Sequence, residues 1–219
     1  MLRLLRNLTN LIYENSCLIC NKGTKELTVC KVCEKDFKER NENSAKYFEL
    51  ITVYSFGYYE NKLRQGIINL KNGKKDLAKY FAEILTMFWK KSNNIKQNDY
   101  LVIPVPSHKK RIKERGYCQA SLIGEEFAQQ LNYDFSNKFV IREKETAFMN
   151  SLENITERKK NIKNAFKVIK NNKSLNNILI IDDILTSGNT MCEIAKTIKQ
   201  LYPDVNLVGL TIASGDTYT

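Results

Sequence analysis

A run of four apolar residues, Ile178 to Ile181, leads directly into two acids and a turn that contains glycine. An apolar run without polar alternation is typical of a strand buried on both faces of a parallel sheet. After the turn, apolar residues recur at helical spacing, at Met191, Ile194, Ala195, Ile198 and Leu201. The order of strand, turn and helix predicts an α/β domain whose turn lies at the carboxyl end of a strand, where parallel sheets bind their ligands.

The turn has the residue types that a phosphate monoester needs. Gly188 permits backbone torsions and a close approach that a Cβ atom would block. Hydroxyls from Thr186, Ser187 and Thr190 lie beside the amides at the start of the predicted helix. The helix dipole adds about half a positive charge at that end. A phosphate group is therefore expected to bind here.

Two adjacent acids, Asp182 and Asp183, precede this turn. They are suited to accept hydrogen bonds from ribose hydroxyls and to stabilise positive charge at the anomeric carbon, which makes them the candidate catalytic residues. A plain strand, turn and helix with a capping side chain would leave both acids unexplained. The chain has no GxxxxGK[ST] sequence and no GxGxxG after a strand, which argues against Walker ATPases and dinucleotide-binding folds. We predict that the following residues bind a ribose phosphate, phosphoribosyl pyrophosphate in particular: Asp182, Asp183, Ile184, Leu185, Thr186, Ser187, Gly188, Asn189 and Thr190.

A second segment predicts contacts to the pyrophosphate. Leu101 to Val105 form a short apolar run, and Pro104 and Pro106 make its end stiff and extended. Basic residues follow, and arginine can bind a phosphate through two parallel hydrogen bonds. The candidate pyrophosphate-binding residues are Ser107, Lys109, Arg111 and Arg115. The alternative is an exposed basic loop without a ligand.

Four of the six cysteines form two CxxC pairs, Cys17 with Cys20 and Cys30 with Cys33. Four thiolates at this spacing suit Zn²⁺ in a closed, structural site. Disulfides would need an oxidising compartment, which nothing in the sequence indicates. We therefore predict about one structural zinc per chain. Cys118 and Cys192 are expected to be packing residues, and His108, the one histidine, cannot supply a catalytic triad unaided.

The net charge of +11 is unevenly distributed. Residues 101–120 carry five Lys or Arg against one acid, and residues 138–173 carry ten against four. Such a basic surface could bind the phosphates of a nucleic acid, although many of the lysines could also be a solubilising background. The candidate nucleic-acid-binding residues are Lys109, Lys110, Lys113, Arg158, Lys159, Lys160 and Lys163.

The rest of the chain predicts supporting elements. Residues 48–59 are expected to form a strand, or a hairpin with Gly57 near its bend. Two helices should follow, one ending near Gly73 and one over about 76–91, as a lid from which Lys71 could point into the site. Residues 1–16 predict an amphipathic helix rather than a signal peptide, and no apolar stretch is long enough to cross a membrane, so a cytoplasmic protein is expected.

The thirteen residues 178–190 resemble the phosphoribosyl pyrophosphate signature of type I phosphoribosyltransferases: four apolar residues, two acids, two apolar residues and T-[TS]-G-x-T. Within that superfamily, nearly the whole chain resembles the ComF competence proteins. The features that carry this resemblance are the two CxxC pairs, the Tyr-rich segment before Lys71, the run PVP…RxxxRGYxQ at 104–119, the block Glu157-Arg158…Asn161…Ala165-Phe166, and the loop itself. Cys118 and Met149 depart from the pattern, where Asn and Gln are usual.

The resemblance implies a Rossmann-like parallel sheet flanked by helices, with a hood and a small N-terminal zinc module built on four cysteines. The expected boundaries are 1–42 for the N-terminal helix and zinc module and 43–219 for the phosphoribosyltransferase-like domain, divided into a hood or lid at 43–95 and a core at 96–219. The resemblance also implies phosphoribosyl pyrophosphate with Mg²⁺ as ligand, a role in DNA uptake, and a helicase of the uptake machinery as partner. Together with the basic segments, it leads to the hypothesis that the chain contacts incoming single-stranded DNA.

Two other functions fit the same residues. One is a metabolic phosphoribosyltransferase of nucleotide salvage or synthesis, which would join a base or amine to the ribose without a side-chain nucleophile. The other is a sensor that binds phosphoribosyl pyrophosphate without turnover. Because Cys118 and Met149 depart from the usual pattern, they should affect the contacts to the acceptor base rather than those to the sugar phosphate.

Overall fold

A computed structural model describes residues 15–37, 45–92, 99–143, 162–170 and 175–215. Several residues singled out from the sequence lie outside these ranges: the N-terminal amphipathic segment up to residue 14, Met149, Arg158, Lys159 and Lys160. Within the described ranges, no helix combines the length and apolar character that a membrane span requires.

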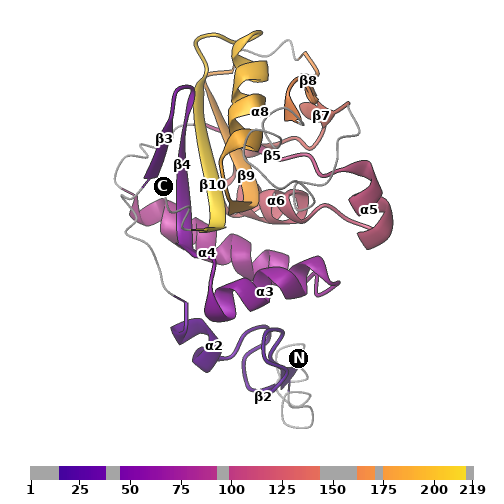
Figure 1. The fold of residues 1–219 in the computed structure, drawn as a ribbon. Helices are drawn as coiled ribbons and strands as arrows, with labels where there is room; N and C mark the ends of the chain where they lie inside the picture. The colour runs from indigo at the N-terminus through magenta and orange to yellow at the C-terminus, as the bar shows by residue number, and fades with distance from the viewer. Residues whose placement is uncertain (1–14, 38–44, 93–98, 144–161, 171–174, 216–219) are drawn as a thin grey trace, which may run out of the picture.

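A six-stranded sheet forms the centre of the molecule, in the order β3-β4-β10-β9-β5-β6 (Figure 1). Its strands are β3 (Ala45–Phe48), β4 (Ile51–Tyr58), β5 (Leu101–Pro104), β6 (Asp134–Phe135), β9 (Asn177–Leu185) and β10 (Asn206–Ser214). All neighbouring pairs are parallel except the edge pair β3 and β4. This mostly parallel sheet confirms the α/β class expected from the sequence, and the thirteen-residue signature begins on its inner strand β9.

The side chains of β9 point alternately to two apolar cores, one on each face of the sheet. Leu179 and Ile181 join the core on the side of α4 and α6, whereas Ile178 and Ile180 join the core on the side of α8. All four side chains are fully buried. This explains why the sequence of the strand is apolar without alternation.

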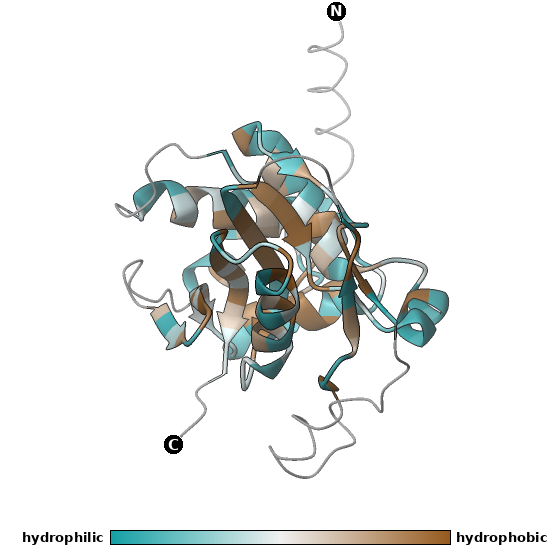
Figure 2. Cartoon of the chain, turned by 90° about the horizontal axis from the view of Figure 1, so that it is seen from above, coloured by the Kyte–Doolittle hydropathy of each residue, from teal (hydrophilic) through white to brown (hydrophobic). Residues whose placement is uncertain are grey.

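Helices cover both faces of the sheet (Figure 1). One face is covered by α4 (Leu77–Lys91) and α6 (Gln119–Leu131), with α3 (Asn61–Lys71) beside α4, and the other by α8 (Asn189–Lys199). A separate antiparallel pair, β7 (Val140–Arg142) and β8 (Phe166–Val168), packs against α8. Figure 2 shows apolar strands at the centre and mostly hydrophilic outer helix faces.

Residues 45–58 differ from expectation in two ways. The hairpin bend lies at Glu49 and Leu50, whereas Gly57 lies within β4 and pairs with Ala213 of β10. The β4 strand stays extended because it pairs with β10 from Thr52 to Tyr58. It is therefore an inner strand of the main sheet, so this part of the 43–95 segment expected as a lid belongs to the sheet itself.

The N-terminal module contains β1 (Asn15–Ser16), β2 (Gly23–Thr24) and α2 (Lys31–Lys35). It lies below α3 at the lower end of the molecule in Figure 1, and its buried side chains pack in one cluster with those of α3 and α4. Its buried residues Cys17, Ile19, Val29 and Cys33 belong to the same apolar cluster as the inner faces of those helices. The module therefore shares a core with the larger domain.

Candidate functional site

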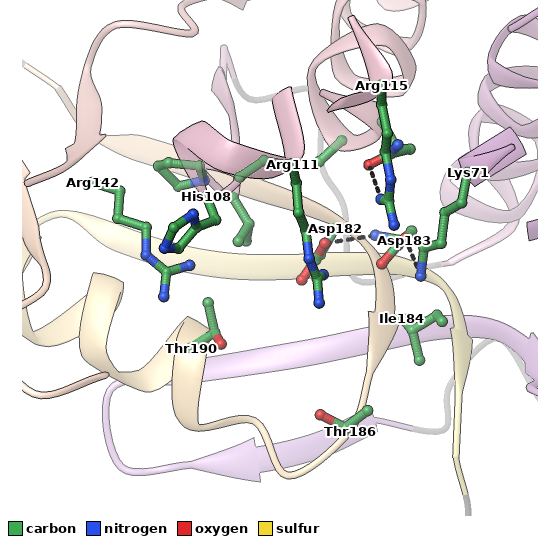
Figure 3. A pocket seen from close by; sticks show the side chains of 15 residues that line it. Lys71, His108, Arg111, Arg115, Arg142, Asp182, Asp183, Ile184, Thr186 and Thr190 are labelled. Carbon is green, nitrogen blue, oxygen red and sulfur yellow. Dashed lines mark hydrogen bonds and ion pairs between the residues drawn. The ribbon is translucent and has the colours of Figure 1, made fainter. Parts of the chain in front are cut away.

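A pocket opens at the carboxyl ends of β5 and β9 (Figure 3). It combines a basic wall, a pair of acids and the start of a helix. The residues that line it are Lys71, Val105, Pro106, Ser107, His108, Arg111, Arg115, Gln119, Ala120, Arg142, Asp182, Asp183, Ile184, Thr186 and Thr190. This is the position at which parallel α/β sheets bind ligands.

The two acids lie in β9 rather than in the loop, because β9 stays paired with β10 as far as Leu185. Asp183 forms an ion pair with Lys71, with 2.7 Å between Oδ2 and Nζ, and its side chain is 15% exposed. The backbone amide of Asp183 donates to Asp182 Oδ1 at 2.8 Å. Both acids are therefore partly buried and held by neighbours, whereas residues of an exposed loop would face solvent.

The environment of Asp182 disfavours its charged form. Burial, followed by the neighbouring Asp183 carboxylate, raises the pKa of Asp182 well above its ordinary value, although the amide of Asp183 and the ammonium of Lys71 act in the opposite direction. A cation or a set of donors in the pocket would favour the ionised form. The ionisation of Asp182 should therefore depend on what binds in the pocket.

The loop between β9 and α8 has the conformation that its glycine predicts. Gly188 has a φ of 76°, in the left-handed region, and a Cβ atom there would collide with the ring of Phe48. Among the described residues, Ser187 Oγ and Asn189 Nδ2 are buried without a hydrogen-bond partner. Neither residue lines the pocket, and Gly188 between them does not line it either.

Not every loop residue reaches the pocket. Ile184, Thr186 and Thr190 line it, whereas Leu185 is buried in the apolar core beside α8. The amides of the first turn of α8, which begins at Asn189, have no acceptor within the helix. The loop thus offers hydroxyls and backbone donors at one end of the pocket, as a phosphate requires.

The opposite wall is formed by α5 (Lys109–Arg115) and the residues before it. Ser107, Arg111 and Arg115 line the pocket, and Arg115 Nη1 donates to Gln119 Oε1 at 3.3 Å. Lys109 does not line the pocket; it is exposed, as are Lys110 and Lys113. The physical reason is helical spacing: residues 111 and 115 are four apart and share a face, whereas 109, 110 and 113 lie on other faces.

Sequence reasoning did not assign Arg142, Gln119 or His108 to the pocket. Arg142 comes from the separate β7 strand, and its guanidinium lies 5.7 Å from the centre of the Phe166 ring. Burial, followed by the positive charge of Arg111, lowers the pKa of Arg142. Two guanidinium groups that repel each other across a pocket favour a bound anion. From the sequence, Arg142 could be recognised only as one of the basic residues at 138–173, because it belongs to no motif.

The remaining candidates lie around the pocket. Lys163 is exposed on the segment before β8. Cys118 precedes α6, and Ser107 Oγ donates to its sulfur at 3.1 Å, so this cysteine contacts the pocket wall indirectly. His108 caps α5, since its Nδ1 accepts from the amide of Lys110 at 3.2 Å.

The four N-terminal cysteines form a cluster whose sulfur atoms all lie within 4.8 Å of one another. The pair Cys17 and Cys33 is separated by 3.9 Å and the pair Cys20 and Cys30 by 3.8 Å between sulfurs. A tetrahedron with Zn–S bonds of about 2.3 Å has edges of about 3.8 Å, so the cluster fits zinc closely. Backbone amides of Ile19 and Cys30 also donate to Cys17 Sγ, each at 3.4 Å, and such bonds stabilise a thiolate.

Comparison with known proteins gave relatives but no matching family model. The chain is 35% identical to competence protein F of Haemophilus influenzae over 102 residues, which cover 46% of this chain and 44% of that protein, less than half of either. It is 24% identical to the DNA utilization protein YhgH of Escherichia coli K12 over 192 residues, which cover 82% of each chain. A crystal structure of an adenine phosphoribosyltransferase matches 68% of this chain and 75% of its own, with 16% identity and a TM-score of 0.43.

Proposed function

We propose that this chain, a homologue of competence protein F and the YhgH DNA utilization proteins, binds phosphoribosyl pyrophosphate with Mg²⁺ and contacts single-stranded DNA during DNA uptake. The observation that carries the ligand is the pocket at the end of β9, which brings two carboxylates together with the hydroxyls of Thr186 and Thr190 from the loop and the start of α8. Arginine side chains complete the opposite wall.

The two ends of the pocket suit the two ends of this ligand. In Figure 3, Thr190, His108 and Arg142 lie toward one end, and Lys71, Arg115 and Asp183 lie toward the other. The 5-phosphate would bind at the first end, where α8 begins, and the pyrophosphate at the second. Asp182 lies between them and would accept hydrogen bonds from the ribose hydroxyls.

Magnesium fits the same arrangement. Among the described residues, Asp182 and Asp183 are the carboxylates that line the pocket. They would hold Mg²⁺ together with ligand oxygens, since this ion is commonly bound by one or two carboxylates plus substrate phosphates. When bound, the ion would neutralise charge on the pyrophosphate group.

The proposed DNA contact uses the outer side of α5. Lys109, Lys110 and Lys113 are exposed there, while Arg111 and Arg115 of the same helix line the pocket. Lysines on a solvent-facing helix surface can bind a single strand through its phosphates, with an affinity that falls steeply as salt is added. A helicase of the uptake machinery is the proposed partner.

Calorimetric titration with phosphoribosyl pyrophosphate and Mg²⁺ tests the ligand. We expect the parent protein to bind and the double variant Asp182→Ala/Asp183→Ala to lose binding while it stays folded. Asp204→Asn, which alters an exposed acid after α8, is the matched control and should bind as the parent does. A parent protein that binds no phosphoribosyl pyrophosphate would refute the proposal.

Fluorescence anisotropy with a labelled single strand tests the DNA contact. The triple variant Lys109→Gln/Lys110→Gln/Lys113→Gln should bind more weakly, and its salt slope should fall by about two because each phosphate contact contributes about 0.7. Binding of the single strand that does not depend on the salt concentration would contradict the proposed DNA contact.

Turnover is a separate question with its own measurement. A metabolic phosphoribosyltransferase would release pyrophosphate when one common nucleobase is added. A sensor would bind the ligand without releasing pyrophosphate for any acceptor. The DNA-uptake proposal requires ligand and DNA binding in the same protein.

A further inference from the structure

The last turn of α3 is bonded to the first CxxC segment of the N-terminal module. Asn69 Nδ2 donates to the carbonyl oxygens of Leu18 and Ile19, at 2.7 and 3.1 Å. Lys74 Nζ, just beyond the helix, donates to the same Leu18 oxygen at 2.9 Å. Leu18 and Ile19 lie between Cys17 and Cys20, so a metal held by these cysteines would fix the two carbonyls.

Apolar packing holds the same helix against the module. Ile19 contacts α3 at Gly66, where an added Cβ would lie 3.1 Å from Ile19 Cδ1 and 3.0 Å from the Phe81 ring. On the other side, the Tyr117 hydroxyl accepts from the amide of Gly73 at 3.0 Å and donates to the carbonyl of Leu70. The end of α3 is thus fixed between the module and the start of α6.

Lys71 lies in this fixed turn, between Asn69 and Gly73. Its ammonium reaches the pocket and pairs with Asp183 at 2.7 Å. Because a lysine side chain has four rotatable bonds, the position of its ammonium depends strongly on where the backbone is held. A shift of the last turn of α3 would therefore move the ammonium away from the acid pair.

We propose that the four-cysteine module is a positioning element for the ligand pocket: its CxxC carbonyls hold Asn69, and Asn69 holds the turn that places Lys71 beside Asp183. This inference rests on the proposed binding of phosphoribosyl pyrophosphate. Asn69 does not line the pocket and would act through Lys71, which does. The module thereby couples metal binding to the pyrophosphate end of the pocket, and the 5-phosphate end, built by α8 and β7, is independent of it.

Asn69→Asp is the variant that tests this coupling. It keeps the size of the side chain and an oxygen that can accept from Gln65 Nε2, but it loses both donors to the module. Calorimetry with three probes should then separate the two ends. We expect about tenfold weaker binding of phosphoribosyl pyrophosphate with Mg²⁺ and of pyrophosphate with Mg²⁺, as the loss of one or two hydrogen bonds implies, and unchanged binding of ribose 5-phosphate.

A double-mutant cycle shows whether Asn69 acts through Lys71. In the Lys71→Met background, Asn69→Asp should have no further effect on pyrophosphate binding. Removal of the metal with a chelator, followed by elemental analysis, should reproduce the selective loss in the parent protein. Ile68, whose backbone bonds lie in the same turn, provides a control as Ile68→Leu, which should bind all three probes as the parent does.

The outcomes distinguish the two proposals. If the parent binds neither phosphoribosyl pyrophosphate nor ribose 5-phosphate, the proposed function fails. If the parent binds both but Asn69→Asp binds all three probes normally, the positioning role alone is overturned. Equal weakening of all three probes would also overturn it, because that result indicates general destabilisation.

Discussion

Lys71 Nζ and Asp183 Oδ2 lie 2.7 Å apart and join the end of α3 to the end of β9. The pair connects a helix next to the cysteine module with the strand at the centre of the sheet. Both side chains line the pocket, with exposed fractions of 23% and 15%. Opposite charges therefore help to hold the pocket in shape.

Asp182→Asn should stabilise the unliganded protein at neutral pH. Because the folded-state pKa of Asp182 is raised, the unfolded chain loses this proton first as the pH rises from about 4. The free energy of unfolding of the parent should then fall by up to about 1.4 kcal/mol per pH unit until the folded-state pKa is passed. Urea unfolding from pH 4 to pH 8 measures this.

The Asp182→Asn variant lacks the titrating group, so its stability should exceed that of the parent above this window. The same change should weaken binding of phosphoribosyl pyrophosphate. If the stability of both proteins changed with pH in the same way, the pKa of Asp182 would not be raised in the folded state, and the prediction would be wrong. The charged groups beside it are Asp183 and Lys71, and both remain in the variant.

Arg142→Ala should weaken binding at the 5-phosphate end. Loss of one hydrogen bond from a charged group costs about 1.5–3 kcal/mol, so ribose 5-phosphate should bind at least roughly tenfold more weakly. Pyrophosphate with Mg²⁺ should bind nearly as well as to the parent. Arg64→Ala, at an exposed arginine on α3, is the control. Equal loss for both probes would argue against two separate ends.

Gly188→Ala should destabilise the protein through two effects. A left-handed φ costs a residue with a Cβ about 1–2 kcal/mol, and the new methyl would collide with the Phe48 ring. The melting temperature should fall by about 4 °C or more. In the Gly188→Ala variant, the additional change Phe48→Leu should restore the stability lost to the collision but not the stability lost to the left-handed φ. No recovery would mean that the backbone torsion alone explains the loss.

Metal analysis should find about one zinc per chain, as four thiolates in one cluster imply. Cys17→Ser should lower the zinc content and the melting temperature together, because the site folds the module around it. Cys192→Ser changes a thiol outside the cluster and should keep the zinc. Folded, metal-free parent protein would contradict the assignment.

Several residues that the sequence singled out within one segment do lie together in the structure. The loop after β9, the turn of α5 with Arg111 and Arg115, and the cysteine cluster are each encoded within a short segment. Their side-chain types and spacing follow from local geometry, which one strand or one helical turn determines. Lys109 was grouped with these arginines but lies outside the pocket, because the face that a short helix presents depends on how that helix docks.

Long-range contacts were harder to predict. Arg142 reaches the pocket because β7 packs with β8 against α8, and no residue near it signals this pairing. Lys71 could be suspected but not paired with Asp183, since the ion pair depends on how α3 docks. The hairpin bend at residues 49–50 was missed because pairing with β10 overrides the tendency of Gly57 to bend.

The shared core of the cysteine module has a practical consequence for producing this protein in pieces. Ile19 of the module packs beside Gly66 and Phe81, and Ile19 and Val29 belong to the same apolar cluster as Leu63 and Ile67. A recombinant fragment starting near residue 43 would expose this apolar surface to water and should precipitate or self-associate. The sequence predicts a boundary between residues 42 and 43, yet the shared core implies that the chain should not be divided there.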